Sequence, residues 1–151
     1  MTEAAGCPLT PPLFAEIIEE VRAHALATGV LPYDEESGTG LLRHIYLRKG
    51  TKSGEIMVCA VINGNKLPDE NGLVAALTEA EPDIRSIIVN VNKEKTNVIL
   101  GKTCRTLWGE DYITDILCGL TFRISPLSFY QVNRDQAEKL YNKAAEYADL
   151  N

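Results

Sequence analysis

Four cysteines have the widest chemical range in this 151-residue sequence, because thiols bind metals, form disulfides and act as nucleophiles. They stand far apart, without a C-x-x-C pair, so their spacing indicates neither a zinc site nor a disulfide framework. Cys59 and Cys118 each lie inside an apolar run and are predicted to be small core residues. Cys104 lies in K-T-C-R-T, where two nearby cations would stabilise a reactive thiolate.

A nucleophilic Cys104 would need a base within reach, and the sequence indicates none. His24 lies on an acidic helix and His44 on a basic strand, and both are expected at the surface. Asp111 and Asp115 stand four apart in a strand-and-turn context, which suits neither a general acid–base pair nor a metal site. No nucleotide-binding, zinc-protease or serine-hydrolase motif is present. Residue types alone therefore predict a domain without its own catalytic centre.

Residues 128–136, S-F-Y-Q-V-N-R-D-Q, place two aromatic residues and an amide where a strand-like run gives way to a helix-like run. A plain turn there would need only Gly or Asp. Phe129 offers a face for stacking, and Gln131 offers an amide that both donates and accepts hydrogen bonds. Tyr130 is interpreted as a packing residue, and Asn133 can cap the following helix. The structural alternative is an aromatic wedge that closes a sheet against the last helix.

Hydrophobic periodicity predicts an α+β domain that would position this junction. The predicted helices lie at 10–28, 72–81 and 133–148, and the predicted strands at 40–50, 55–64, 86–92, 97–101, 103–107, 113–117 and 118–124. Short connections favour a mainly antiparallel sheet with the helices packed on one face. The run at 55–64 is almost wholly apolar, which predicts a central strand covered on both faces, or on one face by helices and on the other by a partner.

Alternation along the strands predicts which side chains face the core. In strand 86–92, the inward set is Ile87, Val89 and Val91, and the outward set is Ser86, Asn90 and Asn92. In strand 40–50, one face carries Leu41, Arg43, Ile45 and Leu47, and the other carries Leu42, His44, Tyr46 and Arg48. In strand 118–124, Cys118, Leu120, Phe122 and Ile124 share a face.

Composition is ordinary for a soluble domain, with 45% hydrophobic and 24% charged residues. No apolar run approaches the roughly 20 residues of a membrane span, and M-T-E-A-A-G lacks the features of a signal peptide, so a cytoplasmic protein is expected. The net charge of −6 argues against nonspecific nucleic-acid binding. Residues 41–54, however, contain four cations and one histidine but no acid, which fits either a local basic patch or a solvated hairpin.

The stretch F-R-I-S-P-L-S-F-Y-Q-V-N-R-D-Q-A-E-K-L-Y, residues 122–141, closely resembles the entry to the catalytic domain of S-adenosylmethionine-dependent RNA (uracil-5-)-methyltransferases. This family makes 5-methyluridine in ribosomal and transfer RNA. Two further stretches resemble its central domain: G-L-L-R-H-I-Y-L-R-K-G followed by G-E-I-M-V, and S-I-I-V-N-V-N followed by N-V-I-L-G. Together they cover nearly the whole chain and favour the 23S rRNA branch over the tRNA branch.

The resemblance implies that Gln131 contacts S-adenosylmethionine and that Phe129 lies beside the cofactor and a flipped-out uracil. Extrusion and stacking are what a methyltransferase acting on a base in folded RNA requires. Asn133 is equally a helix cap and a neighbour of the RNA site. In this family a cysteine attacks uracil C6, the methyl group moves to C5, and the C5 proton is removed. Because no cysteine here lies in a matching motif, we assign no catalytic residue.

The resemblance also implies an RNA-facing surface on the hairpin that follows residue 40. The residues assigned to it are His44, Tyr46, Arg48, Lys49 and Lys52. RNA is therefore the expected partner, most of all rRNA, and neither DNA nor a membrane is expected. The oligomeric state is not predicted.

The N-terminal stretch G-C-P-L-T-P-P-L-F resembles the segment around the last of four cysteine ligands of an iron–sulfur cluster in many of these enzymes. Cys7 matches that ligand, whereas the C-x5-C-x2-C motif that supplies the other three is absent from this sequence. Cys7 is therefore expected to bind a cluster only in a longer protein.

The resemblance divides the chain into a tail at 1–9, a central α+β domain at 10–127, and the start of a Rossmann-like methyltransferase domain at 128–151. We expect these residues alone to be inactive and to hold no cofactor. Two alternatives remain open: an interaction module that uses the apolar strand at 56–62, and a small enzyme that uses Cys104.

Overall fold

The computed structural model describes residues 12–95, 98–127 and 143. In chain order the elements are α1 (Pro12–Thr28), β1 (Leu42–Lys49), β2 (Ile56–Ile62), α2 (Glu70–Ala80), β3 (Ile84–Val91), β4 (Thr103–Gly109), β5 (Ile113–Leu117) and β6 (Leu120–Ile124). Strands β1 to β4 form one sheet in that order, and β5 and β6 form a separate hairpin. Among the described helices, none is long and apolar enough to cross a membrane.

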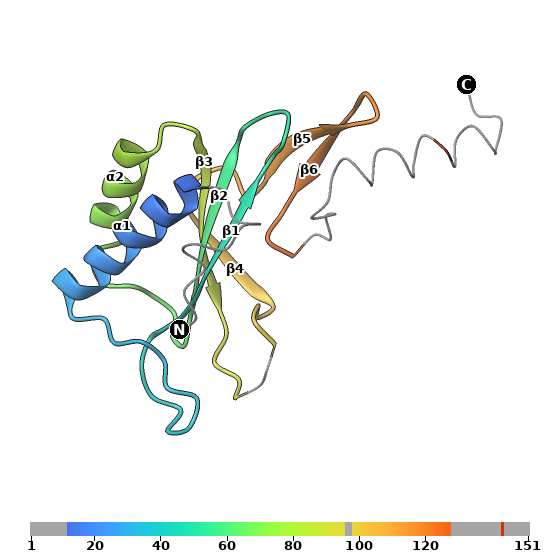
Figure 1. Ribbon diagram of the computed structural model, residues 1–151. Coiled ribbons are helices and arrows are strands. Elements are labelled where there is room, and N and C mark those ends of the chain that lie inside the picture. The colour runs from blue at the N-terminus through green and yellow to red at the C-terminus, as the bar shows by residue number, and fades with distance from the viewer. Residues whose placement is uncertain (1–11, 96–97, 128–142, 144–151) are drawn as a thin grey trace.

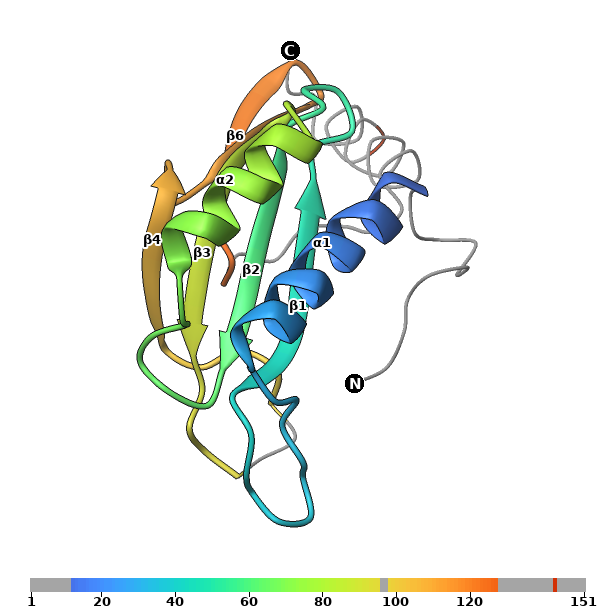
Figure 2. The ribbon, with the colours of Figure 1, turned by 90° about the vertical axis from the view of Figure 1, so that its left-hand side faces the viewer.

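The sheet is mixed, because its central pair, β2 and β3, is parallel, while β1–β2, β3–β4 and β5–β6 are antiparallel. The predicted α+β class, the mainly antiparallel pairing and the helices on one face are confirmed, but the parallel pair at the centre of the sheet was not predicted. The reason is α2, which leads the chain back along the sheet so that β3 starts at the same end as β2. Figure 2 shows α1 and α2 side by side on this face.

The centre of the sheet is covered on both faces, and β2 is buried along its whole length. The helix-side core packs α1 and α2 against one face, and includes Ile17, Val21, Val58, Ile62, Leu73, Leu77, Ile87 and Val89. The hairpin-side core lies under the β5–β6 hairpin and consists of Met57, Cys59, Val61, Ile88, Ile113 and Ile124. The expectation that Cys59 is a core residue is confirmed. The alternative that β2 binds a partner is wrong, because the chain itself covers both of its faces.

The prediction that one face of β3 points to solvent is wrong, because the hairpin-side core covers that face. Ser86, Asn90 and Asn92 are buried rather than solvent-facing. Asn90 Nδ2 donates to Gly101 O at 2.9 Å, and Gly101 N donates to Asn90 Oδ1 at 2.6 Å. Asn92 Nδ2 donates to the carbonyl oxygens of Val98 and Ile99 at 2.9 and 3.1 Å. These amides hold the segment after β3, and the described residues 98–101 of the strand predicted at 97–101 are not a strand but an irregular segment with a bend at Ile99 and Leu100.

A β-bulge between Leu42 and His44 changes the predicted faces of β1. Leu42 joins the helix-side core together with Ile45 and Leu47, although alternation placed it on the opposite face. Arg43 is only 4% exposed, and its Nη1 donates to Asn92 O at 3.0 Å and to Glu94 O at 2.5 Å. Buried Arg43 therefore holds the loop after β3 and takes no part in a surface patch.

Cys118 is exposed and is not the predicted core residue. It has φ 53° and is followed by Gly119 with φ 76°, between the paired residues Leu117 and Leu120. Two consecutive positive φ angles suit the two-residue turn that joins tightly paired strands. Cys118 therefore belongs to the tip of the β5–β6 hairpin. The helix predicted at 133–148 lies outside the described residues except for Lys143, which is helical.

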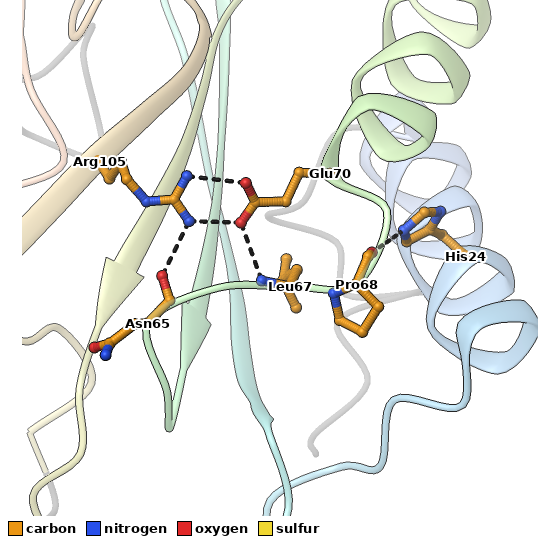
Figure 3. Close-up of polar contacts among 6 residues, drawn as sticks. All are labelled: His24, Asn65, Leu67, Pro68, Glu70 and Arg105. Carbon is orange, nitrogen blue, oxygen red and sulfur yellow. Dashed lines mark hydrogen bonds and ion pairs between the residues drawn. The ribbon is translucent and has the colours of Figure 1, made fainter.

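An ion pair fixes the N-terminus of α2 to β4 (Figure 3). Arg105 donates to both carboxylate oxygens of Glu70, at 2.9 and 2.5 Å, and to Asn65 O at 3.0 Å. Glu70 also accepts the Leu67 N–H at 3.0 Å, and His24 Nε2 lies 3.1 Å from Pro68 O. The loop that begins the β2–α2–β3 crossover is thus tied to β4 on one side and to α1 on the other.

Replacing Glu70 with glutamine should lower the free energy of unfolding by about 1 kcal/mol at pH 7, because the Arg105 side chain is 41% exposed and the pair is partly screened. The Arg105 hydrogen bonds hold the pKa of Glu70 below its usual value. A carboxyl group with a lower folded-state pKa stabilises the protein above its unfolded pKa, and this contribution is lost as the pH falls. The difference between wild type and variant, measured by urea denaturation, should be full above the usual glutamate pKa of about 4.3 and shrink as the pH falls below it.

Glu19→Gln is the matched control. Glu19 pairs with Arg22 at 3.2 Å on the surface of α1, where its side chain is 67% exposed. This substitution should change stability by less than about 0.5 kcal/mol at any pH. Equal effects of the two variants would contradict a stabilising role for the Glu70–Arg105 pair.

Candidate nucleic-acid interface

The hairpin residues predicted to face RNA do not form one patch. Tyr46 lies directly across from Cys59, so His44, Tyr46 and Arg48 point to the side of the β5–β6 hairpin. Lys49 lies across from Ile56 and points to the helix side. All four side chains are half-buried. The strand therefore divides the predicted set between two faces of the sheet.

Tyr46 and Arg48 form a unit on β1. Arg48 Nε donates to the Tyr46 hydroxyl at 2.9 Å, and its guanidinium carbon lies 5.3 Å from the centre of the Tyr46 ring. Tyr46 also packs against the hairpin-side core. Burial and the nearby Arg43 hold the pKa of His44 below its usual value, so its imidazole is neutral at pH 7. The positive charge in this region therefore comes from arginine and lysine alone.

The three cations that remain gather at one end of the sheet, where β1 turns into β2. Arg48 and Lys49 end β1, and Lys52 lies exposed in the turn that follows. We call these three residues and the turn at 50–55 the basic turn. A cluster of cations with an adjacent aromatic ring can bind phosphate and stack on a base. The three cations therefore lie near the tip of the predicted basic hairpin, and their contact with RNA stays a prediction.

The basic turn is docked on β5 (Figure 1). Asp115, which is fully buried, accepts the backbone N–H groups of Thr51, Lys52 and Ser53 at 3.0, 2.9 and 3.2 Å. Thr114 donates to Glu55 Oε2 through its N–H at 2.6 Å and through its hydroxyl at 2.9 Å. No sequence pattern pairs Asp115 with this turn, since more than 60 residues separate them.

A further cation that the sequence analysis did not single out lies on β6, the partner strand of β5. Arg123 on β6 is exposed and lies directly across from Thr114. Its guanidinium carbon is 4.6 Å from the centre of the Tyr112 ring. The pair repeats the arginine-and-tyrosine arrangement of Tyr46 and Arg48. The sequence shows Arg123 as a cation in the strand-like run T-F-R-I. Its distance along the chain from Arg48, Lys49 and Lys52 gives no indication that it lies on the strand paired with β5.

The cysteines show no catalytic arrangement within the described part of the chain. Burial raises the pKa of Cys59 to about 12, so this thiol is protonated at neutral pH. Cys104 is exposed, and its Sγ accepts a hydrogen bond from Asn90 Nδ2 at 3.2 Å, a contact with an amide that cannot serve as a base. Among the residues that the structure describes, no group of histidine, cysteine and carboxylate side chains could hold a metal ion.

Four residues assigned from the sequence lie outside the described residues. They are Cys7, Phe129, Gln131 and Asn133. The cofactor and iron–sulfur assignments therefore rest on the sequence.

Comparison with known proteins gives consistent relatives, although no family model matches the chain. It is 42% identical over 144 residues to an uncharacterized RNA methyltransferase of Oceanobacillus iheyensis, which covers 95% of this chain and 31% of the relative. It is 43% identical over 135 residues to one of Halalkalibacterium halodurans, covering 89% of this chain and 30% of the relative. The chain thus spans about a third of the length of the curated relatives it matches.

A solved structure is also similar. The tRNA (uracil-54, C5)-methyltransferase of Pyrococcus abyssi, in complex with S-adenosyl-L-homocysteine, matches with a TM-score of 0.81 and 29% sequence identity. The match covers 97% of this chain and 35% of the archaeal chain. Together with the curated relatives, it confirms the resemblance to methyltransferases that act on RNA.

Proposed function

Starting from the homology of this chain with RNA methyltransferases over nearly its whole length, we propose that it is part of an enzyme that transfers a methyl group from S-adenosylmethionine to C5 of uracil in RNA. The observation that carries the proposal is the match to the Pyrococcus abyssi enzyme, whose name states both the base and the carbon atom. The region described here would contribute RNA-facing surface.

The cofactor part of the proposal rests on residues 128–133. Phe129 and Gln131 would form one edge of the pocket for S-adenosylmethionine, with Phe129 also beside the uracil and Asn133 near the RNA. The bound S-adenosyl-L-homocysteine of the archaeal enzyme is the product of that cofactor's chemistry and supports its use in this family. Cys7 would serve as an iron–sulfur ligand only together with cysteines outside this sequence.

The RNA part of the proposal rests on the basic turn. Lys52 is exposed in the turn, and Arg48 and Lys49 precede it on β1 with their side chains on opposite faces of the sheet, so an RNA backbone could meet Lys52 together with one of them. Sequence resemblance favours 23S rRNA as the substrate, and the name of the archaeal enzyme favours tRNA. We keep rRNA as the first proposal and include both RNAs in the test.

A chain with Lys49 and Lys52 both changed to glutamine should bind a uridine-containing RNA about tenfold more weakly than the wild type at about 0.1 M salt. The logarithmic salt dependence of binding should fall by about two, one for each lysine that no longer neutralises a phosphate. Fluorescence anisotropy with labelled 23S rRNA and tRNA fragments measures both quantities. With labelled S-adenosylmethionine, the 151-residue chain is expected to transfer no methyl group to either RNA.

The matched control changes Lys66 and Lys93 to glutamine, because both are exposed and neither belongs to the basic turn. An equal loss of affinity in both double variants would mean that net charge, not the basic turn, governs binding. Binding that does not depend on salt would contradict an RNA-facing role, and methyl transfer by the chain alone would contradict its inactivity.

A further inference from the structure

The basic turn does not need the Asp115 carboxylate in order to form its own hydrogen bonds. The basic turn already has its own backbone hydrogen bonds, from Gly50 N to Glu55 O at 2.9 Å and from Gly54 N to Gly50 O at 2.9 Å. Three further N–H groups of the turn donate to Asp115, which lies on β5, a strand of the other sheet. A buried carboxylate is costly to desolvate, and hydrogen bonds from several N–H groups offset that cost.

The contact fixes the position of the turn as a whole. Ser53 Oγ donates to Thr114 O at 2.6 Å, beside the Asp115 contacts. The approach is so close that a Cβ atom on Gly50 would lie 2.8 Å from Thr114 O and 3.2 Å from Asp115 Cγ. Only glycine fits at position 50 without displacing the turn from β5. The backbone on both sides of Lys52 is therefore held, while its side chain is exposed.

We propose that Asp115 is a positioning residue for RNA binding, which holds the backbone of the basic turn so that Lys52 meets the RNA already ordered. The inference rests on the proposed function, because it needs Lys52 to contact RNA. Ordering a flexible segment on binding reduces affinity, and a segment that is ordered beforehand avoids that loss. Asp115 itself is buried and would not touch the RNA.

The same contact joins the basic turn to the β5–β6 hairpin. Arg123 lies across from Thr114, the residue that accepts from Ser53 and donates to Glu55. Holding the turn on β5 thus sets the spacing between Lys52 and Arg123. Cations held at a fixed spacing can match successive phosphates. Cations on flexible segments would lose conformational entropy when they adopt that spacing on binding.

The test is a double-mutant cycle with Asp115→Asn and Lys52→Gln in the 151-residue chain, with affinity for the labelled uridine-containing RNA as the readout. An asparagine keeps the shape of the side chain but removes the charge and turns an amide toward the backbone N–H groups. Each single variant should bind about three- to tenfold more weakly. Asp115→Asn should cause no further loss once Lys52 is glutamine, because the residue acts through Lys52.

Full additivity of the two losses would overturn the inference, since a residue that only stabilises the fold would weaken binding in both backgrounds. Unchanged affinity in Asp115→Asn, with a loss in Lys52→Gln, would also overturn it while leaving the RNA-binding proposal intact. Unchanged affinity in Lys52→Gln would defeat both, because the inference needs that contact.

A second variant serves if Asp115→Asn fails to fold. Ser53→Ala removes the bond to Thr114 O and leaves the buried carboxylate in place. It should weaken RNA binding by about two- to threefold in the wild-type background and have no effect in the Lys52→Gln background. The same loss in both backgrounds would overturn the inference.

Discussion

Replacing Ile88 with alanine should lower the free energy of unfolding by about 2–5 kcal/mol, as much as the replacement of its neighbour Ile87. Each side chain is only 1% exposed, Ile88 in the hairpin-side core and Ile87 in the helix-side core. Truncation of either leaves a cavity that the surrounding strands can fill only in part. Urea denaturation followed by circular dichroism measures the loss, with equal m-values as the check on two-state unfolding.

Ile99→Ala is the matched control, since the same substitution at a side chain that is 48% exposed should cost far less than in either core. Comparison of Ile88→Ala with Ile99→Ala tests whether both faces of β3 are buried, whereas alternation in the sequence predicted only one buried face. A cost for Ile88 close to that for Ile99 would mean that the β5–β6 hairpin does not cover the sheet in solution.

Replacing Arg43 with methionine should cost about 2–4 kcal/mol, because the guanidinium group is 4% exposed and bonds two backbone carbonyls with a charged donor. Its guanidinium carbon also lies 4.2 Å from the centre of the Tyr33 ring, so the side chain links the loop before β1 to the loop after β3. Urea denaturation measures the loss. Amide hydrogen exchange should become faster at residues 92–95, where the carbonyl contacts lie.

Two further variants define what Arg43 contributes. Arg43→Lys keeps the charge but not the planar fork, so it should recover only part of the stability that methionine removes. Arg85→Met removes an arginine that is exposed, and whose Nη1 donates to Pro82 O at 2.7 Å, so its cost should stay below about 1 kcal/mol. Equal costs for Arg43→Met and Arg85→Met would contradict a structural role for the buried arginine.

Local patterns predicted the elements well, since periodicity depends only on neighbours in the chain. The apolar run that became β2 and the helical spacing that became α2 are examples. The parallel pairing of β2 with β3 was missed because it depends on where α2 directs the chain. The bulge at Leu42 was missed because a single extra residue leaves no mark on composition.

The sequence predicted only those residues of the candidate site that lie close to one another along the chain. Arg48, Lys49 and Lys52 were found as a run of cations. Asp115 was not, because it reaches the basic turn through the fold from a distant part of the chain, and Arg123 was not, because only its pairing with Thr114 relates it to that turn. Polar residues of β3 were predicted to face solvent, since asparagines that bind backbone carbonyls look in sequence like asparagines that bind water.

The placement of β2 at the centre of the sheet has a consequence for how the chain must be handled. Its seven residues, Ile56 to Ile62, are all apolar and include neither charge nor proline, a composition that promotes cross-β association between chains when it is exposed. In the folded protein β1 and β3 occupy both of its edges, and the two cores cover both faces. The same strand that anchors the fold is thus the segment from which aggregation would start whenever the chain opens.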